Sequence, residues 1–250
     1  MAKSNVCDNI KCFVAGINRG PFRFLKEAHT NTPDSEFVES RNNDKDIFRC
    51  AIDQAWLDMC RTLRGKKTKT KNLEKCKENM AESLEQYFSI KPRKSKCEFD
   101  KWHNETTLQF REVKNFTVGQ SQKILNMAMK YLYCCNNYRI EKKEYFKYCH
   151  MPLDSYILNW YKSDVDKDYD IEPWSKIDDL DKYNEKVDKI RQALGTEYVL
   201  EKEFEIWHTE KERADKKALR ACANRIIESP ACSKALKELL QKVCDELKVD

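Results

Sequence analysis

The chain has 250 residues, of which 40% are hydrophobic and 36% charged, and its net charge at pH 7 is +5. This length allows a sizeable core, whereas five glycines and six prolines are too few for the turns of an all-β protein. No apolar run reaches the roughly 18 residues of a membrane span, and the N-terminus lacks a signal sequence, so we expect a cytoplasmic protein without membrane contact.

The first half of the chain shows helical periodicity interrupted by basic loops. Apolar residues recur at three- and four-residue spacing within 34–63, and residues 73–88 are amphipathic, so both stretches are predicted to be helical. Two loops rich in Lys and Arg, 64–71 and 91–96, follow these stretches. They would suit contact with a phosphate backbone, although exposed basic loops are also common on solvated surfaces.

Residues 121–135 are predicted to form a central helix, because their nearly continuous apolar character is typical of a buried element. The stretch Val118-Gly119 is predicted to be a glycine turn that leads into this helix, with Lys123 in the first helical turn. The positive end of the helix dipole disfavours an ammonium, so a lysine there is a candidate amine nucleophile. Lys130, two turns further along, is the weaker candidate, and a lysine that extends into solvent is the structural alternative.

The second half of the chain also indicates helices. Met151-Pro152-Leu153-Asp154 precedes an apolar stretch, and Asp154 is predicted to cap the next helix. Further helices are predicted over 177–194, where Gly195 ends the helix, and over 199–207, 214–227 and 234–247. No strand pattern long enough to build a sheet and no fixed repeat is present, so the architecture is predicted to be all-α.

The residues that could bind a metal ion do not form a recognised pattern. The acidic loop 164–172 begins like a calcium-binding EF-hand, but Tyr169 and Ser175 occupy the positions that need glycine and glutamate. It is therefore interpreted as a solvated acidic loop. The twelve cysteines and four histidines lack the spacing of a metal site, so we expect no metal and no cofactor.

Two motifs together resemble the helix-hairpin-helix DNA glycosylase superfamily. Val118-Gly119 followed by Lys123 is similar to its lysine-bearing hairpin, and Met151-Pro152-Leu153-Asp154 is similar to its aspartate motif. The closest resemblance is to the 8-oxoguanine glycosylases and their archaeal relatives, and the separation of 31 positions (154 − 123) is nearer to the archaeal branch. The match covers residues 110–160 by motif, and the remainder only by helical class.

The resemblance implies one two-lobed helical unit over residues 1–250, with a helix-hairpin-helix DNA-binding element. Residues 34–135 would form the central lobe, and residues 1–33 with 150–250 the second lobe. It also implies a monomer that binds double-stranded DNA with one base flipped out. Lys123 and Asp154 would be catalytic. The remaining expected DNA contacts are Gly119, Gln120, Ser121 and Tyr156. The base-pocket candidates, for which packing in the core is the commoner role, are Trp102, Trp160, Trp174 and Trp207.

The implied activity is excision of a damaged or modified base, with strand cleavage if Lys123 forms a Schiff base. Such an enzyme would serve DNA repair or the defence of a bacterium against modified phage DNA. Two alternatives remain open at this point. One is a non-catalytic helical module that binds DNA or RNA, and the other is a helical interaction protein whose basic loops are only surface.

Overall fold

The described part of the chain is helical. The computed structural model describes residues 6–17, 44–63, 72–92, 95–113, 116–135 and 141–247, and these ranges contain helices and no strand. The predicted all-α class is therefore confirmed for these ranges. The basic loop 64–71 lies outside the described residues, as do residues 93–94 of the second basic loop.

Nine α-helices occur in the described ranges. They are α1 (Val6–Ala15), α3 (Asp44–Met59), α4 (Leu73–Ser89), α5 (Lys96–Leu108), α6 (Val118–Cys134), α8 (Ser155–Trp160), α9 (Leu180–Leu194), α10 (Val199–Ile227) and α11 (Lys234–Glu246). Short 3-10 turns adjoin them at η3 (Cys60–Leu63), η4 (Gln109–Glu112) and η7 (Trp174–Lys176). As predicted, Gly195 ends α9, and its positive φ of 59° is the left-handed conformation that favours glycine.

Two helices differ from the sequence prediction. The prediction lacks α5, although the Ser95 side chain accepts a hydrogen bond from the Glu98 amide and so caps its first turn. The prediction also divides α10 into two helices, whereas the structure has one helix of 29 residues. The intervening residues contain neither Gly nor Pro, and the ion pair between Arg213 and Glu210 at 2.6 Å spans one of those turns.

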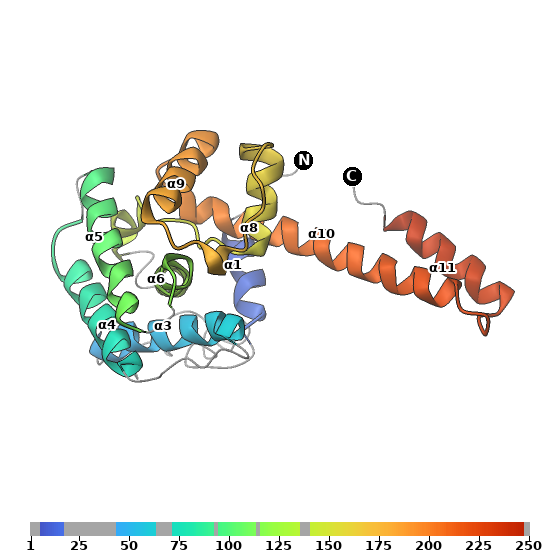
Figure 1. Cartoon of the computed structure of the whole chain (residues 1–250), viewed down its shortest axis with the longest axis horizontal. Helices are drawn as coiled ribbons and strands as arrows, with labels where there is room; N and C mark the ends of the chain where they lie inside the picture. The colour runs from blue at the N-terminus through green and yellow to red at the C-terminus, as the bar shows by residue number, and fades with distance from the viewer. Residues whose placement is uncertain are drawn as a thin grey trace.

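Helix α6 is the central element of the fold. Figure 1 looks along this helix, with α1, α3, α4, α5, α8 and α9 arranged around it. All 17 of its residues are buried, which confirms the central, mostly buried position predicted from its apolar character. Because the helix also contains Gln122, Lys123, Asn126 and Lys130, each of these polar side chains needs a partner inside the protein.

Two apolar clusters meet at α6. The larger contains residues of α1, α3, α4, α5, most of α6 and the first turns of α10, including Phe13, Phe48, Phe99 and Phe204. The smaller gathers Val118 at the head of α6 with residues of the 151–161 segment, η7–α9 and the start of α10. Lys123 and Asp154 therefore come from segments on either side of the boundary between the clusters. The predicted division into two lobes stays a prediction.

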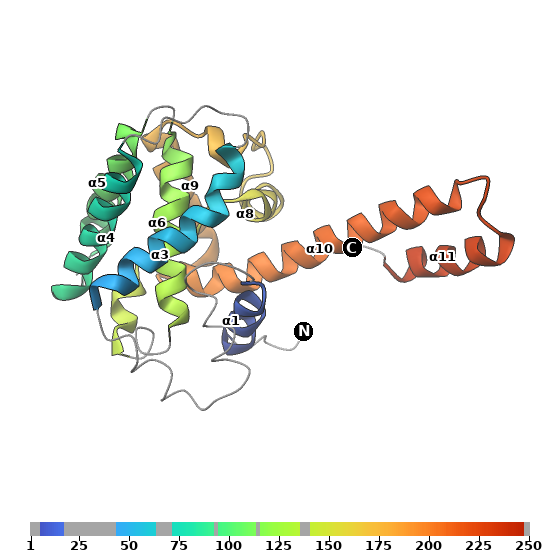
Figure 2. The same cartoon turned by 90° about the horizontal axis from the view of Figure 1, so that it is seen from below.

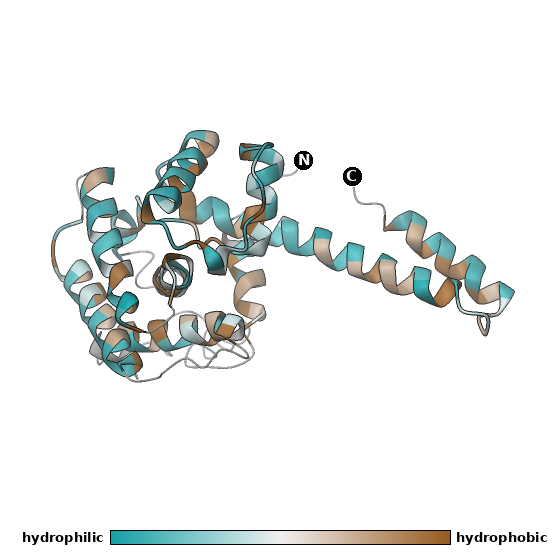
Figure 3. Ribbon diagram, viewed as in Figure 1, coloured by the Kyte–Doolittle hydropathy of each residue, from teal (hydrophilic) through white to brown (hydrophobic). Residues whose placement is uncertain are grey.

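The C-terminal part of the chain projects from this body as an arm, which we define as residues 211–247. Figures 1 and 2 show α10 leaving the body and α11 folding back along it as an antiparallel hairpin. Figure 3 shows apolar positions alternating with polar ones along both helices of the arm. Within the arm only Ala223 and Cys244 are buried.

Candidate functional site

The first turn of α6 begins earlier than predicted. Thr117 is the N-cap, its hydroxyl accepts a hydrogen bond from the Gln120 amide, and the Gln120 side chain accepts one from the Thr117 amide. This reciprocal capping box places Gly119 inside the helix instead of in a glycine turn. The expected position of Lys123 in the first turn is therefore wrong, since it lies in the second turn, where the field of the helix end has already weakened.

The N-terminal amides of α6 all donate hydrogen bonds within the protein. Val118 donates to the Asp178 carboxylate at 3.3 Å, Gly119 to the Ile177 carbonyl at 2.7 Å, and Ser121 to the Thr117 carbonyl at 3.1 Å. In this structure these donors are therefore not available to a phosphate, which is the role expected for a helix-hairpin-helix element. The side chains of Gln120 and Ser121, two of the expected DNA contacts, are also fully buried.

Gly119 is required at its position for a steric reason. A Cβ atom there would lie 1.8 Å from the carbonyl oxygen of Trp174 in η7, closer than any real contact. The missing side chain therefore allows η7 to pack directly on the backbone of α6, with the Gly119 amide bonded to Ile177 beside it. Through this contact the glycine positions the segment that leads into α9.

Lys123 and Asp154, the two expected catalytic residues, lie together. The Lys123 Nζ is 2.9 Å from the Asp154 Oδ2, and the side chains are only 7% and 14% exposed. The other oxygen of Asp154 accepts hydrogen bonds from the amides of Tyr156 and Ile157 at 3.0 Å each, so Asp154 caps α8 as predicted. One carboxylate oxygen thus fixes the side chain, and the other faces the lysine.

A buried hydrogen-bond network supports α6 one turn after Lys123. The Asn126 amide group donates to Gln122 at 2.8 Å and to the Tyr183 hydroxyl at 3.0 Å, and its oxygen accepts from His103 at 2.7 Å. Gln122 in turn donates to the Leu153 carbonyl at 3.3 Å, directly before Asp154. These bonds link the lysine helix to the aspartate segment by a second connection, independent of the ion pair.

The network continues from Tyr183 to the protein surface. His150 accepts from the Tyr183 hydroxyl at 2.8 Å and donates to Asp100 at 2.8 Å, and Arg191 donates two bonds to the same carboxylate. Burial lowers the pKa of His150 to about 4, against the opposing effect of Asp100. Burial also opposes ionisation of Asp100, but the bonds from His150 and Arg191 outweigh it and lower its pKa.

A second ion pair lies deeper on the same face of α6. Lys130 Nζ is 2.5 Å from the Glu203 Oε2, and both side chains are 1% exposed. The ammonium also lies 3.9 Å from the ring centre of Phe13 and 4.6 Å from that of Phe204. Burial raises the pKa of Glu203, Lys130 lowers it, and the charges of Asp154 and Lys123 contribute as well, so the two ion pairs form one electrostatic cluster.

The expected aromatic residues do not all lie at this cluster. Tyr156 and Trp207 contact each other edge to face, with ring centres 5.8 Å apart, and the Lys130 ammonium lies 5.3 Å from the Trp207 ring. Trp174 is half-buried and packs against both apolar clusters, whereas Trp160 packs against the smaller one. The structure therefore brings Tyr156 and Trp207 close to the charged residues, and gives Trp160 and Trp174 packing roles.

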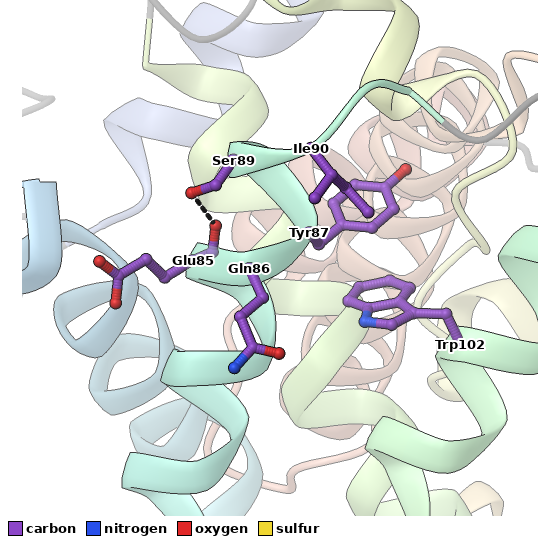
Figure 4. A pocket seen from close by; sticks show the side chains of 6 residues that line it. All are labelled: Glu85, Gln86, Tyr87, Ser89, Ile90 and Trp102. Carbon is purple, nitrogen blue, oxygen red and sulfur yellow. Dashed lines mark hydrogen bonds between the residues drawn. The ribbon is translucent and has the colours of Figure 1, made fainter.

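Trp102 lies elsewhere, at a cavity between α4 and α5. Its ring stacks on Tyr87 with centres 4.1 Å apart, and the cavity of about 430 Å³ is completed by Glu85, Gln86, Ser89 and Ile90. Figure 4 shows the stacked rings forming one wall and the polar side chains of α4 the other. The cavity holds none of the residues of the Lys123–Asp154 cluster.

Comparison with known proteins gives no relative. No protein-family model, no curated protein and no solved structure matches the chain. The assignment of a function therefore depends on the residues and their geometry.

The described residues offer no other site of obvious chemistry. No three of their His, Cys, Asp and Glu side chains gather where they could hold a metal ion, and none of their helices is long and apolar enough to cross a membrane. The sequence prediction missed Glu203, because a glutamate in a charged helix looks like a solvated residue. Its signal is weak but present, since Glu203 lies three positions after Leu200 and four before Trp207, at the spacing of residues that share one face of a helix.

Proposed function

We propose that the chain is a DNA glycosylase that excises a damaged or modified base, with Lys123 and Asp154 as its catalytic pair. One observation carries the proposal, which is the distance of 2.9 Å between Lys123 Nζ and Asp154 Oδ2. The two motifs are 31 positions apart in the chain, yet they place a lysine and a helix-capping carboxylate side by side at low exposure. The finer fold assignment, a two-lobed bundle with a helix-hairpin-helix element, belongs to the same proposal.

Asp154 would act on the sugar of the flipped nucleotide. Departure of the base leaves positive charge on the sugar, and a carboxylate held in place by two backbone amides stabilises that charge without reorganising. The same carboxylate can accept a proton from the incoming nucleophile. Since Asp154 caps α8 through these two amides, its orientation relative to α8 does not depend on the substrate.

Lys123 would be the nucleophile in the bifunctional route. The amine attacks the sugar carbon as the bond to the base breaks, and one proton of the original ammonium passes through Asp154 to the departing base. A second amine proton goes to the ring oxygen as the sugar ring opens, which leaves a Schiff base that allows β-elimination. In the monofunctional route a water takes the place of the amine and leaves an abasic site. In either route the nucleotide sugar must enter between the two side chains and separate the ion pair.

The position of Lys130 argues against it as the nucleophile. Its ammonium is enclosed by Phe13, Phe204 and Trp207 and is bound to Glu203, with 1% of the side chain exposed. A sugar in a DNA strand is too large to reach such a group without opening the core. Lys123, at 7% exposure, is the more accessible of the two amines.

A panel of duplexes that each carry one modified base, including 8-oxoguanine, tests the proposal. Release of a free base is measured directly, and borohydride is added to trap a Schiff base. We expect base release by the wild-type chain, loss of the trapped adduct in Lys123→Gln, and a decrease in base release of about 100-fold or more in Asp154→Asn. Lys130→Gln is included to test the second lysine.

Lys77→Gln is the matched control, because Lys77 is also a nearly buried lysine, 9% exposed and 2.9 Å from Asp53, but lies outside the site. It should keep base release and the adduct. Equal base release in Lys123→Gln, Asp154→Asn and wild type would show that the site is wrongly assigned. If the wild type released no base but bound DNA with a steep salt dependence, the chain would be a non-catalytic binding module.

A further inference from the structure

The arm of residues 211–247 has almost no core of its own. Its two helices contact each other near Ala223, and the Cys244 thiol lies 3.5 Å from the Asn224 side chain, but no other arm residue is buried. An isolated pair of helices in water is marginal, because most helical stability comes from packing of an apolar face. The two helices of the arm therefore bury less apolar surface against each other than an isolated helix pair needs to be stable.

The arm also exposes an ordered set of apolar residues. Of the eight large hydrophobic residues that are exposed in the described ranges, five are on the arm: Leu219, Ile226, Leu236, Leu239 and Val243. On α10, exposed Cys222 lies between Leu219 and Ile226 and completes a spacing of three and four residues. On α11, Leu236, Leu239 and Val243 have the same spacing, which is that of a coiled-coil seam.

Both seams lie on one broad face of the arm. Successive residues of a helix are rotated by about 100°, so the α10 seam is rotated away from Ala223, and the α11 seam away from Cys244, in the same sense about each helix axis. Because the two helices are antiparallel, rotation in the same sense places both seams on the same side of the hairpin. This side is a two-helix apolar face with no partner in the described part of the chain.

We propose that this face binds the same face of a second copy of the chain, so that two arms form a four-helix bundle. An apolar face built from two antiparallel helices is complementary to itself about a two-fold axis, which is the commonest symmetry of protein oligomers. The exposed large hydrophobic residues of the body, Ile90, Leu108 and Ile171, are too scattered to supply a matching seam. A dimer differs from the monomer that the resemblance implied.

The size of the face is sufficient for such a dimer. The arm part of α10 and the 13 residues of α11 are about 20–25 Å long, and two helices side by side are about 20 Å wide. Contact along the whole of this side of the arm would bury about 500 Å² on each copy and about 1,000 Å² in the pair, which reaches the lower limit of specific interfaces. The apolar seams, about 11 Å long on each helix, would occupy about half of that length. Interfaces near this limit are typical of weak complexes, so the dimer is expected to dissociate on dilution.

Sedimentation velocity of the 250-residue chain over about 1–100 µM tests the proposal. We expect concentration-dependent dimerisation of the wild type, and an increase in the dimer dissociation constant of about 100-fold or more in Leu219→Glu and Leu239→Glu, since each places an unpaired carboxylate in the interface. Ile171→Glu is the control, because Ile171 is also an exposed large hydrophobic residue, 43% exposed against 59% for Leu219 and Leu239, but lies on the body. It should dimerise like the wild type.

Because the substituted side chains are exposed, circular dichroism should show unchanged helix content in all variants. A wild type that stays monomeric over the whole range overturns the proposal. So does a dimer that is unaffected by both arm substitutions, or one that Ile171→Glu disrupts equally. These results are independent of the catalytic assignment, since no residue of the arm belongs to the Lys123–Asp154 site.

Discussion

Acidification should destabilise the fold through its buried histidines. Burial lowers the pKa of His150 from 6.5 to about 4, so between these values the unfolded chain binds a proton at His150 that the folded chain does not. Each pH unit in this window removes about 1.4 kcal/mol from the free energy of unfolding. At about pH 5, which is about 1.5 units below 6.5, His150 alone would lower the free energy of unfolding by about 2 kcal/mol. The free energy of unfolding of a protein is typically about 5–15 kcal/mol in total.

Other groups of the same network do not cancel this loss. Burial also lowers the pKa of His103, aided by the nearby charge of His150, so His103 acts in the same direction. The pKa of Asp100 is lowered, and its contribution is lost only when the pH falls below the ordinary value of 3.8. The contribution of this network to the stability is therefore complete above pH 6.5 and declines as the pH falls towards 4.

Urea titrations at about pH 7 and pH 5 measure the effect, in the wild type and in His150→Gln. Glutamine has no proton to gain, so the variant should be less stable at pH 7 but lose about 2 kcal/mol less on acidification than the wild type does. Equal free energies of unfolding for the wild type at both pH values would refute the reasoning, and so would the same pH-dependent loss in the wild type and the variant.

Two further predictions concern packing around α6. Gly119→Ala should push η7 from the helix, because its Cβ would meet the Trp174 oxygen, and we expect a loss of about 1–3 kcal/mol or more and a lower midpoint of thermal unfolding. Gly16→Ala, where the nearest atom would be 3.2 Å away, should be much milder. Lys130→Met should lose about 3–5 kcal/mol in urea, because it leaves Glu203 buried without a counter-charge. Adding Glu203→Leu should recover much of that loss, and a double variant less stable than Lys130→Met would contradict this account.

Local sequence signals predict part of this structure well. The aspartate before an apolar stretch predicts Asp154 as a helix cap, and the continuous apolar character of 121–135 predicts a buried helix, because both depend only on neighbouring residues. The capping box of Thr117 and Gln120 is also visible in the sequence, and it would have placed the start of α6 correctly. The predicted glycine turn at Gly119 is wrong because Thr117, two positions earlier, already caps the helix.

Long-range contacts decide the rest of the site. Gly119 looks like a turn residue until Trp174, 55 positions later (174 − 119), is seen to pack against its backbone. In the same way, Lys130 looks like an alternative nucleophile until Glu203 and Phe13 are seen to enclose it. Sequence periodicity identifies which face of a helix is apolar, but it does not identify which distant residue covers that face.

The complete burial of α6 has a consequence for how a substrate could be admitted. Because α6 is enclosed along its whole length, it cannot move unless both apolar clusters open. Lys123 is therefore the less mobile partner in its ion pair with Asp154. Asp154 stands instead at the head of α8, a helix of six residues near the surface. The ion pair would therefore open by displacement of the segment that carries Asp154, while α6 and Lys123 stay in place.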